Sequence, residues 1–258
     1  MSSGALANVV RDIGPRCARA FVLPAGTFRA EYRACGACGG YALDIEPRSD
    51  VILGSRRIGL LGGSFNPAHE GHRHISLIAL KRLGLHEVWW MLTPQNPLKN
   101  SSDTAPFQER LKAATRVAMH PRIRVTDIEK GLGTAHTADT LALLLPRFPK
   151  CRFVWLMGAD NLVQVSEWKN WRRIFRLVPI AVFARPPYSK SALVARASRV
   201  FADSRVAESR ASSMAMMSPP AWVFLHTRPH AGSATRIRAR KASASGKRAP
   251  MMIASGQH

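Results

Sequence analysis

The sequence predicts an α/β protein with a Rossmann-like, doubly wound parallel sheet. From Arg57 onward, short apolar runs alternate with amphipathic segments, which is the pattern of strand–helix–strand units. Right-handed crossovers place the helices on both faces of such a sheet, and ligands bind at the carboxyl ends of its strands. A chain of 258 residues is long enough for one large domain with a continuous core.

The periodicity predicts the order of the elements. Four helical patterns are expected at residues 70–83, 106–119, 137–148 and 160–175, the last in one or two pieces. Residues 186–220 are less regular and are expected to form a peripheral helix and loop. The six expected strands lie at residues 58–61, 87–92, 123–128, 152–157, 179–183 and 222–225.

Composition divides the chain into three segments. Residues 1–54 mix Gly, Pro, Arg and Cys without periodicity, and we expect a poorly ordered or weakly structured extension there. Residues 55–240 carry the alternating pattern, and 241–258 are expected to form a basic, flexible tail. We hypothesise a natural start near Val51 or Leu53, because either could be encoded by an alternative start codon.

The net charge of +22, from 38 basic and 16 acidic residues, is the unusual number in the composition. Residues 1–50 are nearly neutral, so the excess lies in the remainder, and such a chain attracts polyanions. Nucleic acid, nucleotides and nucleotide-sugar phosphates are therefore candidate partners. No run approaches the roughly 20 apolar residues of a membrane span, no secretory signal is visible, and cysteines are few. We predict a cytoplasmic protein.

The first predicted strand runs directly into the segment GGSFNPAHEGH, residues 62–72. The two glycines allow a tight turn and close approach to a ligand, and the N–H groups at a helix start attract phosphate. His69 and His72 are three residues apart, so in a first helical turn they point to the same side. Two imidazole donors aimed at a polyphosphate stabilise the charge that grows during nucleotidyl transfer. The alternative is a pair of surface histidines that only cap the helix.

This segment resembles the H-x-G-H signature of the nucleotidyltransferase superfamily, and in particular that of the bacterial nicotinate-nucleotide adenylyltransferases. Further segments match in consistent order over about residues 57–240. They are Thr93–Lys99, Phe107–Arg110, His136–Leu141, Gly158–Leu162 with Trp168, Ala184–Tyr188 and Ser233–Arg238. The resemblance implies a parallel sheet of the nucleotidyltransferase type.

The resemblance implies an ATP site made of three stretches. ATP would lie over the turn after the first strand, with both imidazoles on its phosphates and its ribose at the end of the fourth strand. A short helix start near the carboxyl terminus would bind phosphate. These residues are Gly62, Gly63, Ser64, Phe65, His69, His72, Gly158, Asp160, Ser233, Thr235 and Arg238. His69, His72 and Arg238, together with Lys99, are the implied catalytic residues.

The resemblance also implies an acceptor site. Trp168 would stack on a pyridine ring and Thr137 would bind the nicotinate carboxylate. Asn96 and Lys99 would hold the mononucleotide phosphate or the pyrophosphate. His136 stands where the family usually has an aromatic residue. Trp171 is interpreted as a core residue.

The implied reaction transfers an adenylyl group from ATP to nicotinate mononucleotide, giving nicotinate adenine dinucleotide (deamido-NAD) and pyrophosphate in pyridine nucleotide biosynthesis. Mg²⁺ would enter with ATP and keep most of its waters, so no protein metal site is expected. Another H-x-G-H adenylyltransferase, with nicotinamide mononucleotide or phosphopantetheine as acceptor, is an alternative. A basic nucleic-acid-binding protein is a second, which accounts for the charge but not for residues 62–72. The charge also predicts weak, non-specific nucleic-acid adhesion by an enzyme.

Overall fold

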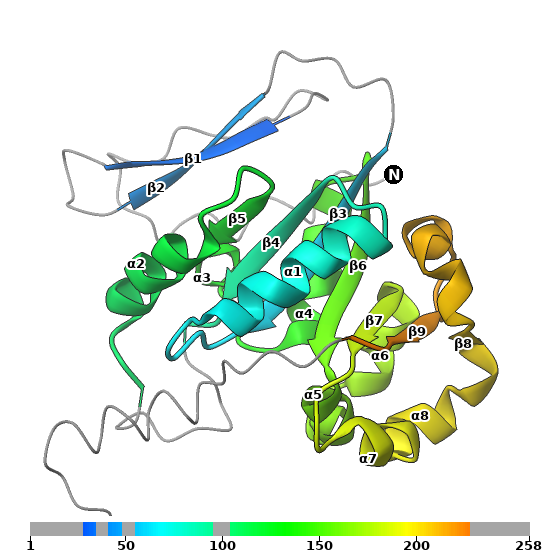
Figure 1. Ribbon diagram of the computed structural model, residues 1–258. Helices are drawn as coiled ribbons and strands as arrows, with labels where there is room; N and C mark the ends of the chain where they lie inside the picture. Colours follow the sequence, from blue (N-terminus) through cyan, green and yellow to red (C-terminus); the bar gives the residue numbers. More distant parts are fainter. Residues whose placement is uncertain (1–27, 35–40, 48–54, 95–103, 228–258) are drawn as a thin grey trace, which may run out of the picture. The chain divides into compact units, whose positions relative to one another are not determined.

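The computed structural model describes residues 28–34, 41–47, 55–94 and 104–227 (Figure 1). Internal contacts divide the chain into two compact units, Met1–Gly54 and Ser55–His258. No helix in these described ranges is long and apolar enough to cross a membrane.

The described part of the first unit is an antiparallel pair of strands. β1 (Phe28–Ala34) pairs with β2 (Tyr41–Pro47) along their whole length. Neither strand was predicted, because both segments mix charged and apolar residues over only seven positions each.

The second unit contains a seven-stranded sheet in which every pair is parallel, in the order β5-β4-β3-β6-β7-β9-β8. The chain moves outward from β3 through β4 to β5 and then restarts beside β3 with β6, so the strand order reverses between β3 and β6. The predicted fold class is confirmed. The strands are β3 (Arg56–Gly63), β4 (Glu87–Leu92), β5 (Ile123–Thr126), β6 (Cys151–Gly158), β7 (Ile180–Phe183), β8 (Arg205–Val206) and β9 (Trp222–Leu225).

All six predicted strands are present; β4 and β9 have the predicted bounds, and the bounds of the other four differ by one or two residues. β5 ends at Thr126 rather than at residue 128, because the Thr126 hydroxyl accepts the N–H of Ile128 at 3.1 Å and a short helix begins there. β8 was not predicted, since two residues within a stretch rich in Ala, Ser and Arg give no detectable alternation.

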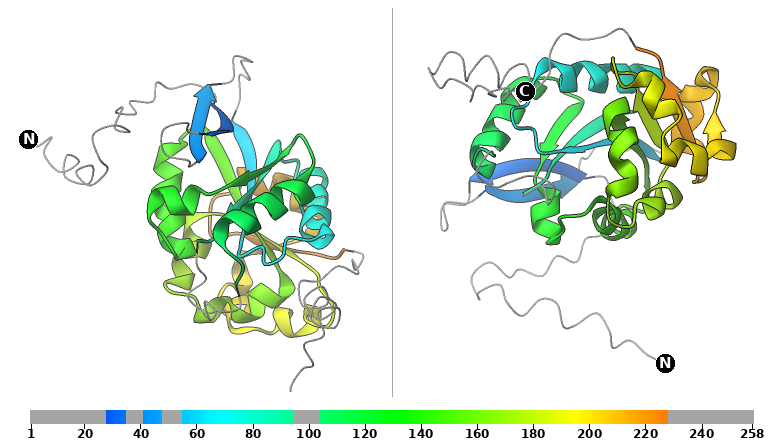
Figure 2. Two further views of the ribbon diagram at one scale, coloured as in Figure 1. Left: turned by 90° about the vertical axis from the view of Figure 1, so that its left-hand side faces the viewer. Right: turned by 90° about the horizontal axis from the view of Figure 1, so that it is seen from below.

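Helices cover both faces of the sheet, with α1 on one face and α4 and α6 on the other (Figure 2). The predicted helix over 160–175 is in two main pieces, separated by a 3₁₀ turn at Val165–Glu167. The α-helices of this unit are α1 (Glu70–Arg82), α2 (Phe107–Ala118), α3 (Ile128–Leu132), α4 (Thr137–Leu144), α5 (Ala159–Gln164), α6 (Trp171–Leu177), α7 (Ser189–Leu193) and α8 (Arg196–Val200).

Large aromatic side chains fill the core between the layers. Trp90 of β4 is buried, and its indole N–H donates to the Ser76 hydroxyl of α1 at 2.8 Å. Trp222 of β9 donates to the carbonyl of Phe201 at 2.7 Å. Trp171 is buried with its ring edge-on to Phe201, so its interpretation as a core residue is confirmed. This packing fixes the strand ends that carry the candidate site.

Candidate active site

The candidate site begins at the turn after β3, next to the point where the strand order reverses. Gly62 allows β3 to lie close to β6, since a Cβ there would be 2.5 Å from the Trp155 ring. Phe65 has a left-handed backbone (φ 45°) and a ring that is only 2% exposed. That ring stacks on Trp90 with centroids 5.0 Å apart. Burial of the ring offsets the backbone strain, which costs about 1–3 kcal/mol, so the turn is held in one conformation.

His69 and His72 together cap the first turn of α1. Nδ1 of His69 accepts the N–H of Gly71 at 3.0 Å, and Nδ1 of His72 accepts the N–H of His69 at 3.2 Å. The two rings face each other with centroids 3.9 Å apart. Because Nδ1 is an acceptor in each ring, the neutral imidazoles carry their proton on Nε2. The histidines thus cap the helix and are also paired as potential N–H donors.

His72, like His69, is half-buried. Its pKa is lowered to about 3, mainly by burial, with further lowering contributions from His69 and Arg185 and an opposing contribution from the hydrogen bond of the His69 backbone. The Phe65 ring packs on it with centroids 4.8 Å apart. At neutral pH, His72 is therefore an uncharged donor held in one orientation.

Asp160 lies in the first turn of α5, directly after β6. Its Oδ2 accepts a hydrogen bond from Nη1 of Arg185 at 2.7 Å. Its Oδ1 is buried and has no hydrogen-bond partner among the described residues. A Cβ at Gly158 would lie 2.4 Å from this oxygen, so the glycine leaves room for it. A buried acceptor without a donor suits a ligand hydroxyl.

Thr137 and Trp168 are placed by neighbouring segments. Thr137 is the first residue of α4, and Trp168 directly follows the 3₁₀ turn after α5. Lys169 of the second segment forms an ion pair with Asp139 in the first turn of α4, with Nζ and Oδ2 3.9 Å apart. Trp168 packs against the core but remains partly exposed, which leaves ring surface for a ligand.

Arg110 of α2 is a buried cation beneath the turn, and it is only 3% exposed. Its guanidinium donates to four carbonyls, those of Ser64 (2.7 Å), Thr93 (3.0 Å), Pro94 (2.7 Å) and Ala105 (2.9 Å). Within the described residues it contacts no carboxylate. Burial lowers its pKa, but an arginine remains charged. One side chain thus joins the turn after β3, the end of β4 and the start of α2.

Glu129 of α3 is a second buried charged residue, 3% exposed. Its Oε1 accepts from the hydroxyl of Thr140 at 3.5 Å, and its Oε2 is buried without a hydrogen-bond partner in the described part of the chain. Burial raises its pKa to about 7, while hydrogen bonds from Thr93 and Thr140 oppose the rise. The carboxyl group links the end of β4 to α4.

The model of one protein family, described as cytidylyltransferase-like, matches residues 60–240. The chain belongs to this family. A probable nicotinate-nucleotide adenylyltransferase of Parvibaculum lavamentivorans is 47% identical over 75% of this chain and 96% of its own. Another, of Methylorubrum extorquens, is 49% identical over 71% of this chain and 100% of its own. The resemblance predicted from the motifs is thus confirmed.

Solved structures agree with the fold of this cytidylyltransferase-like chain. The Plasmodium falciparum nicotinic acid mononucleotide adenylyltransferase complexed with NaAD gives a TM-score of 0.54. The match has 16% identity and covers 71% of this chain and 83% of the other. At this level of identity, the likeness supports the fold.

Some site residues predicted for this cytidylyltransferase-like protein lie outside the described residues: Asn96, Lys99, Ser233, Thr235 and Arg238. Their roles stay predictions. In the described part of the chain, no group of three or more His, Cys, Asp or Glu side chains could hold a metal ion.

Arg110, Glu129 and Arg185 were not predicted as site residues, although Arg110 and Arg185 stand in segments that match the family. An arginine on an amphipathic helix is expected to face solvent. Glu129 was expected to follow a strand that ran to residue 128, and the short helix that contains it was not predicted.

A signal for Arg185 was present in the sequence. It comes two residues after the end of β7, at the same edge of the sheet as Asp160.

Proposed function

We propose that this chain transfers the adenylyl group of ATP to nicotinate mononucleotide, releasing pyrophosphate and forming nicotinate adenine dinucleotide for NAD biosynthesis in the cytoplasm. The observation that carries the proposal is the pair of capping histidines, His69 and His72, at the reversal point of the sheet. The relatives, which are close to 50% identical over most of their length, support the choice of acceptor.

In this reaction, a phosphate oxygen of nicotinate mononucleotide attacks the α-phosphorus of ATP in line with the leaving group. The new P–O bond forms as the bond to pyrophosphate breaks. No general base is required, because the attacking phosphate is already ionised, and no covalent enzyme intermediate is needed. Catalysis then consists of alignment and stabilisation of charge.

The histidines supply directional hydrogen bonds to the triphosphate. With Nδ1 of each ring bonded to the helix start, a neutral ring offers its Nε2–H to a phosphate oxygen. Since the pKa of His72 is about 3, its ring needs no deprotonation before ATP binds at neutral pH. Preorganised donors of this kind stabilise developing charge without reorganisation.

The ribose of ATP is proposed to bind Asp160 through the buried Oδ1 that lacks a donor. Arg185 holds the other oxygen, so the carboxylate is fixed before the ligand arrives. The nucleotide substrate is proposed to be MgATP, in which Mg²⁺ would neutralise part of the triphosphate charge. Ser233, Thr235 and Arg238 are proposed to bind phosphate, as the family resemblance implies.

The acceptor is proposed to bind between α4 and the segment after α5. Trp168 stacks on the pyridine ring, and Thr137 with neighbouring amides binds the carboxylate. Asn96 and Lys99 are proposed to hold its phosphate. The ion pair between Lys169 and Asp139 supports this arrangement, because it ties the two segments together at 3.9 Å.

Pyrophosphate release from MgATP tests the proposal, with nicotinate mononucleotide, nicotinamide mononucleotide, phosphopantetheine and no acceptor run side by side. We expect strong preference for nicotinate mononucleotide. Preference for another acceptor would reassign the substrate, and no release with any of them would contradict adenylyl transfer.

His72→Ala tests the role of the histidine pair. We expect kcat to fall by about a hundredfold or more, by analogy with the loss of one preorganised donor. His120→Ala is the matched control, because His120 precedes β5 at the opposite edge of the sheet. Near-normal kcat for the His72 variant would contradict the assignment.

A further inference from the structure

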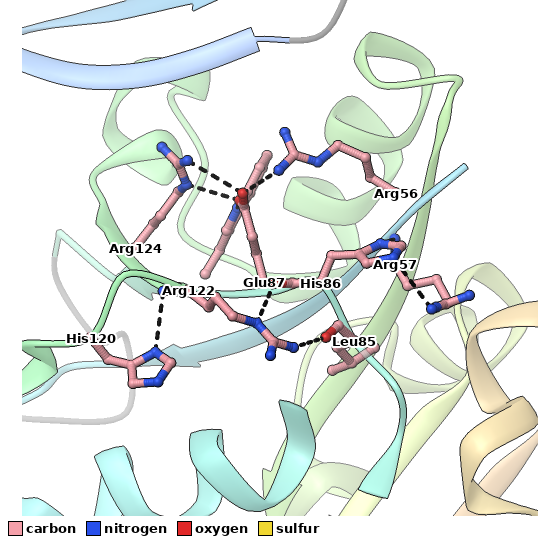
Figure 3. A network of polar contacts seen from close by, with 9 residues as sticks. Arg56, Arg57, Leu85, His86, Glu87, His120, Arg122 and Arg124 are labelled. Carbon is pink, nitrogen blue, oxygen red and sulfur yellow. Dashed lines mark hydrogen bonds and ion pairs between the residues drawn. The ribbon is translucent and has the colours of Figure 1, made fainter. Parts of the chain in front are cut away.

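Basic side chains gather where the central strands begin, at the edge of the sheet opposite the candidate active site (Figure 3). One acid, Glu87 of β4, accompanies them among the described residues at the starts of β3, β4, β5 and β6. We call this set the amino-edge surface; it comprises Arg56, Arg57, Arg122, Arg124, Lys150 and Arg152.

Glu87 is fully engaged within the cluster and is only 4% exposed. Its carboxylate forms ion pairs with the guanidinium of Arg56 and with Nε of Arg124, the latter at 2.9 Å. It also accepts the indole N–H of Trp89 at 3.1 Å. The acid therefore compensates the two inner arginines, while the four outer basic residues have no acidic partner among the described residues.

Two of the outer arginines are fixed in place by carbonyls. Arg57 donates through Nε to the carbonyl of Gly84 at 2.7 Å. Arg122 donates through Nε to the carbonyl of His86 at 2.9 Å and through Nη2 to that of Leu85. Nη1 of each has no partner in the described part of the chain. A guanidinium held in this way loses little side-chain entropy when it binds a ligand.

The basic residues form a row along the sheet edge. Arg57 and Arg152 are register partners on adjacent strands, and Arg152, Lys150 and Arg122 are exposed. The row spans four neighbouring strands, from β5 to β6, which is about 14 Å at the usual strand spacing. A duplex carries one phosphate per strand for every ~3.4 Å of helix axis, so such a row can face more than one of them.

The neighbouring histidines report the same concentration of positive charge. Burial lowers the pKa of His86, and Arg57, Arg56 and Arg122 lower it further, while Glu87 opposes them. Burial and Arg122 likewise lower the pKa of His120. At both histidines the effect of the arginines thus exceeds that of the acid.

We propose that the amino-edge surface binds the phosphate backbone of nucleic acid without sequence preference. Five of its six basic residues are arginines, whose planar guanidinium binds phosphate oxygens in pairs. All strands of the sheet are parallel, so their starts and ends lie at opposite edges. A bound nucleic acid therefore leaves the ATP site open. The proposal is independent of the proposed enzymatic function.

The test is fluorescence anisotropy of a short labelled DNA duplex with the full chain, between about 50 and 200 mM salt. The variant is the triple substitution Arg57→Gln, Arg122→Gln and Arg152→Gln. Its matched control is Arg173→Gln, Arg176→Gln and Arg199→Gln, which removes the same charge from exposed positions on α6 and α8.

We expect the amino-edge triple variant to bind about tenfold or more weakly, with a salt slope shallower by about two to three. The control should retain most of the affinity. Equal loss in both variants would show that net charge alone drives binding and would overturn the proposal, as would unchanged binding in the amino-edge variant.

Two further measurements keep the test decisive. The double variant Lys150→Gln and Arg152→Gln removes no hydrogen bond among the described residues, so it should fold normally, as thermal unfolding would show, and still bind DNA more weakly. Vesicles containing anionic phospholipid test the other source of phosphate. Loss of vesicle binding with DNA binding intact would make this a membrane site and would overturn the proposal.

Discussion

The two edges of the sheet both concentrate nitrogen donors, but they hold them differently. At the carboxyl edge, His72 is neutral and half-buried, and Arg110 is surrounded by backbone carbonyls. At the amino edge, Arg122 and Arg152 face solvent, and Glu87, the one acid among the described residues there, pairs with the inner arginines alone. Donors with fixed directions suit one ligand in one pose. Solvated charges suit a repeating polyanion whose position can vary.

The comparison predicts that charge removal is most costly at the carboxyl edge. Arg110→Met should lower the free energy of unfolding by about 3–5 kcal/mol, because it leaves buried carbonyls from three segments without donors. Urea denaturation measures this. Arg173→Met, at an exposed position on α6, is the control and should change stability by less than about 0.5 kcal/mol. Equal losses of unfolding free energy in the two variants would mean that the hydrogen bonds of Arg110 to the carbonyls do not stabilise the fold.

Glu129→Gln should produce a pH-dependent change at the same edge. The pKa of Glu129 is raised from 4.5 to about 7, so the folded state binds this proton more tightly than the unfolded state. The resulting stability is fully present below pH 4.5 and is lost as the pH rises through about 7. Relative to the Gln variant, the native chain should therefore lose on the order of 3 kcal/mol over this range. Denaturation at several pH values measures the difference, and a constant difference would contradict the raised pKa.

Glu87→Gln should have the smallest effect of the three, about 1–2 kcal/mol, because Arg56 and Arg124 are partly exposed and water screens their repulsion. The loss should shrink at high salt, unlike that of Arg110→Met. Unfolding free energies at low and high salt test this contrast. A loss of stability that does not depend on salt would mean that the charges around Glu87 are shielded from solvent, as Arg110 is, and would contradict this expectation.

The sequence predicted those features of the fold and of the candidate site that depend on residues close together in the chain. The apolar runs predicted the strands because a parallel sheet covered on both faces buries successive side chains, as in β4 and β7. The histidine pair was predictable because its spacing and the Gly62–Gly63 turn are contiguous. Arg110 was not, since its partner Ser64 is 46 residues away and only folding brings them together. The hydrogen bonds that fix a buried ion are properties of the tertiary structure.

The capping arrangement of α1 limits how this region can change by mutation. Ser or Asp would cap a helix better than His at position 69, and Glu at position 72 would complete the more common form of the capping box. Selection for helix stability alone would therefore replace both imidazoles. If activity were not selected, mutation of residues 69–72 to Ser-Glu-Gly-Glu would stabilise the helix and remove both imidazoles in the same steps. The residues at positions 69 and 72 would therefore distinguish relatives that keep the proposed activity from relatives that keep only the fold.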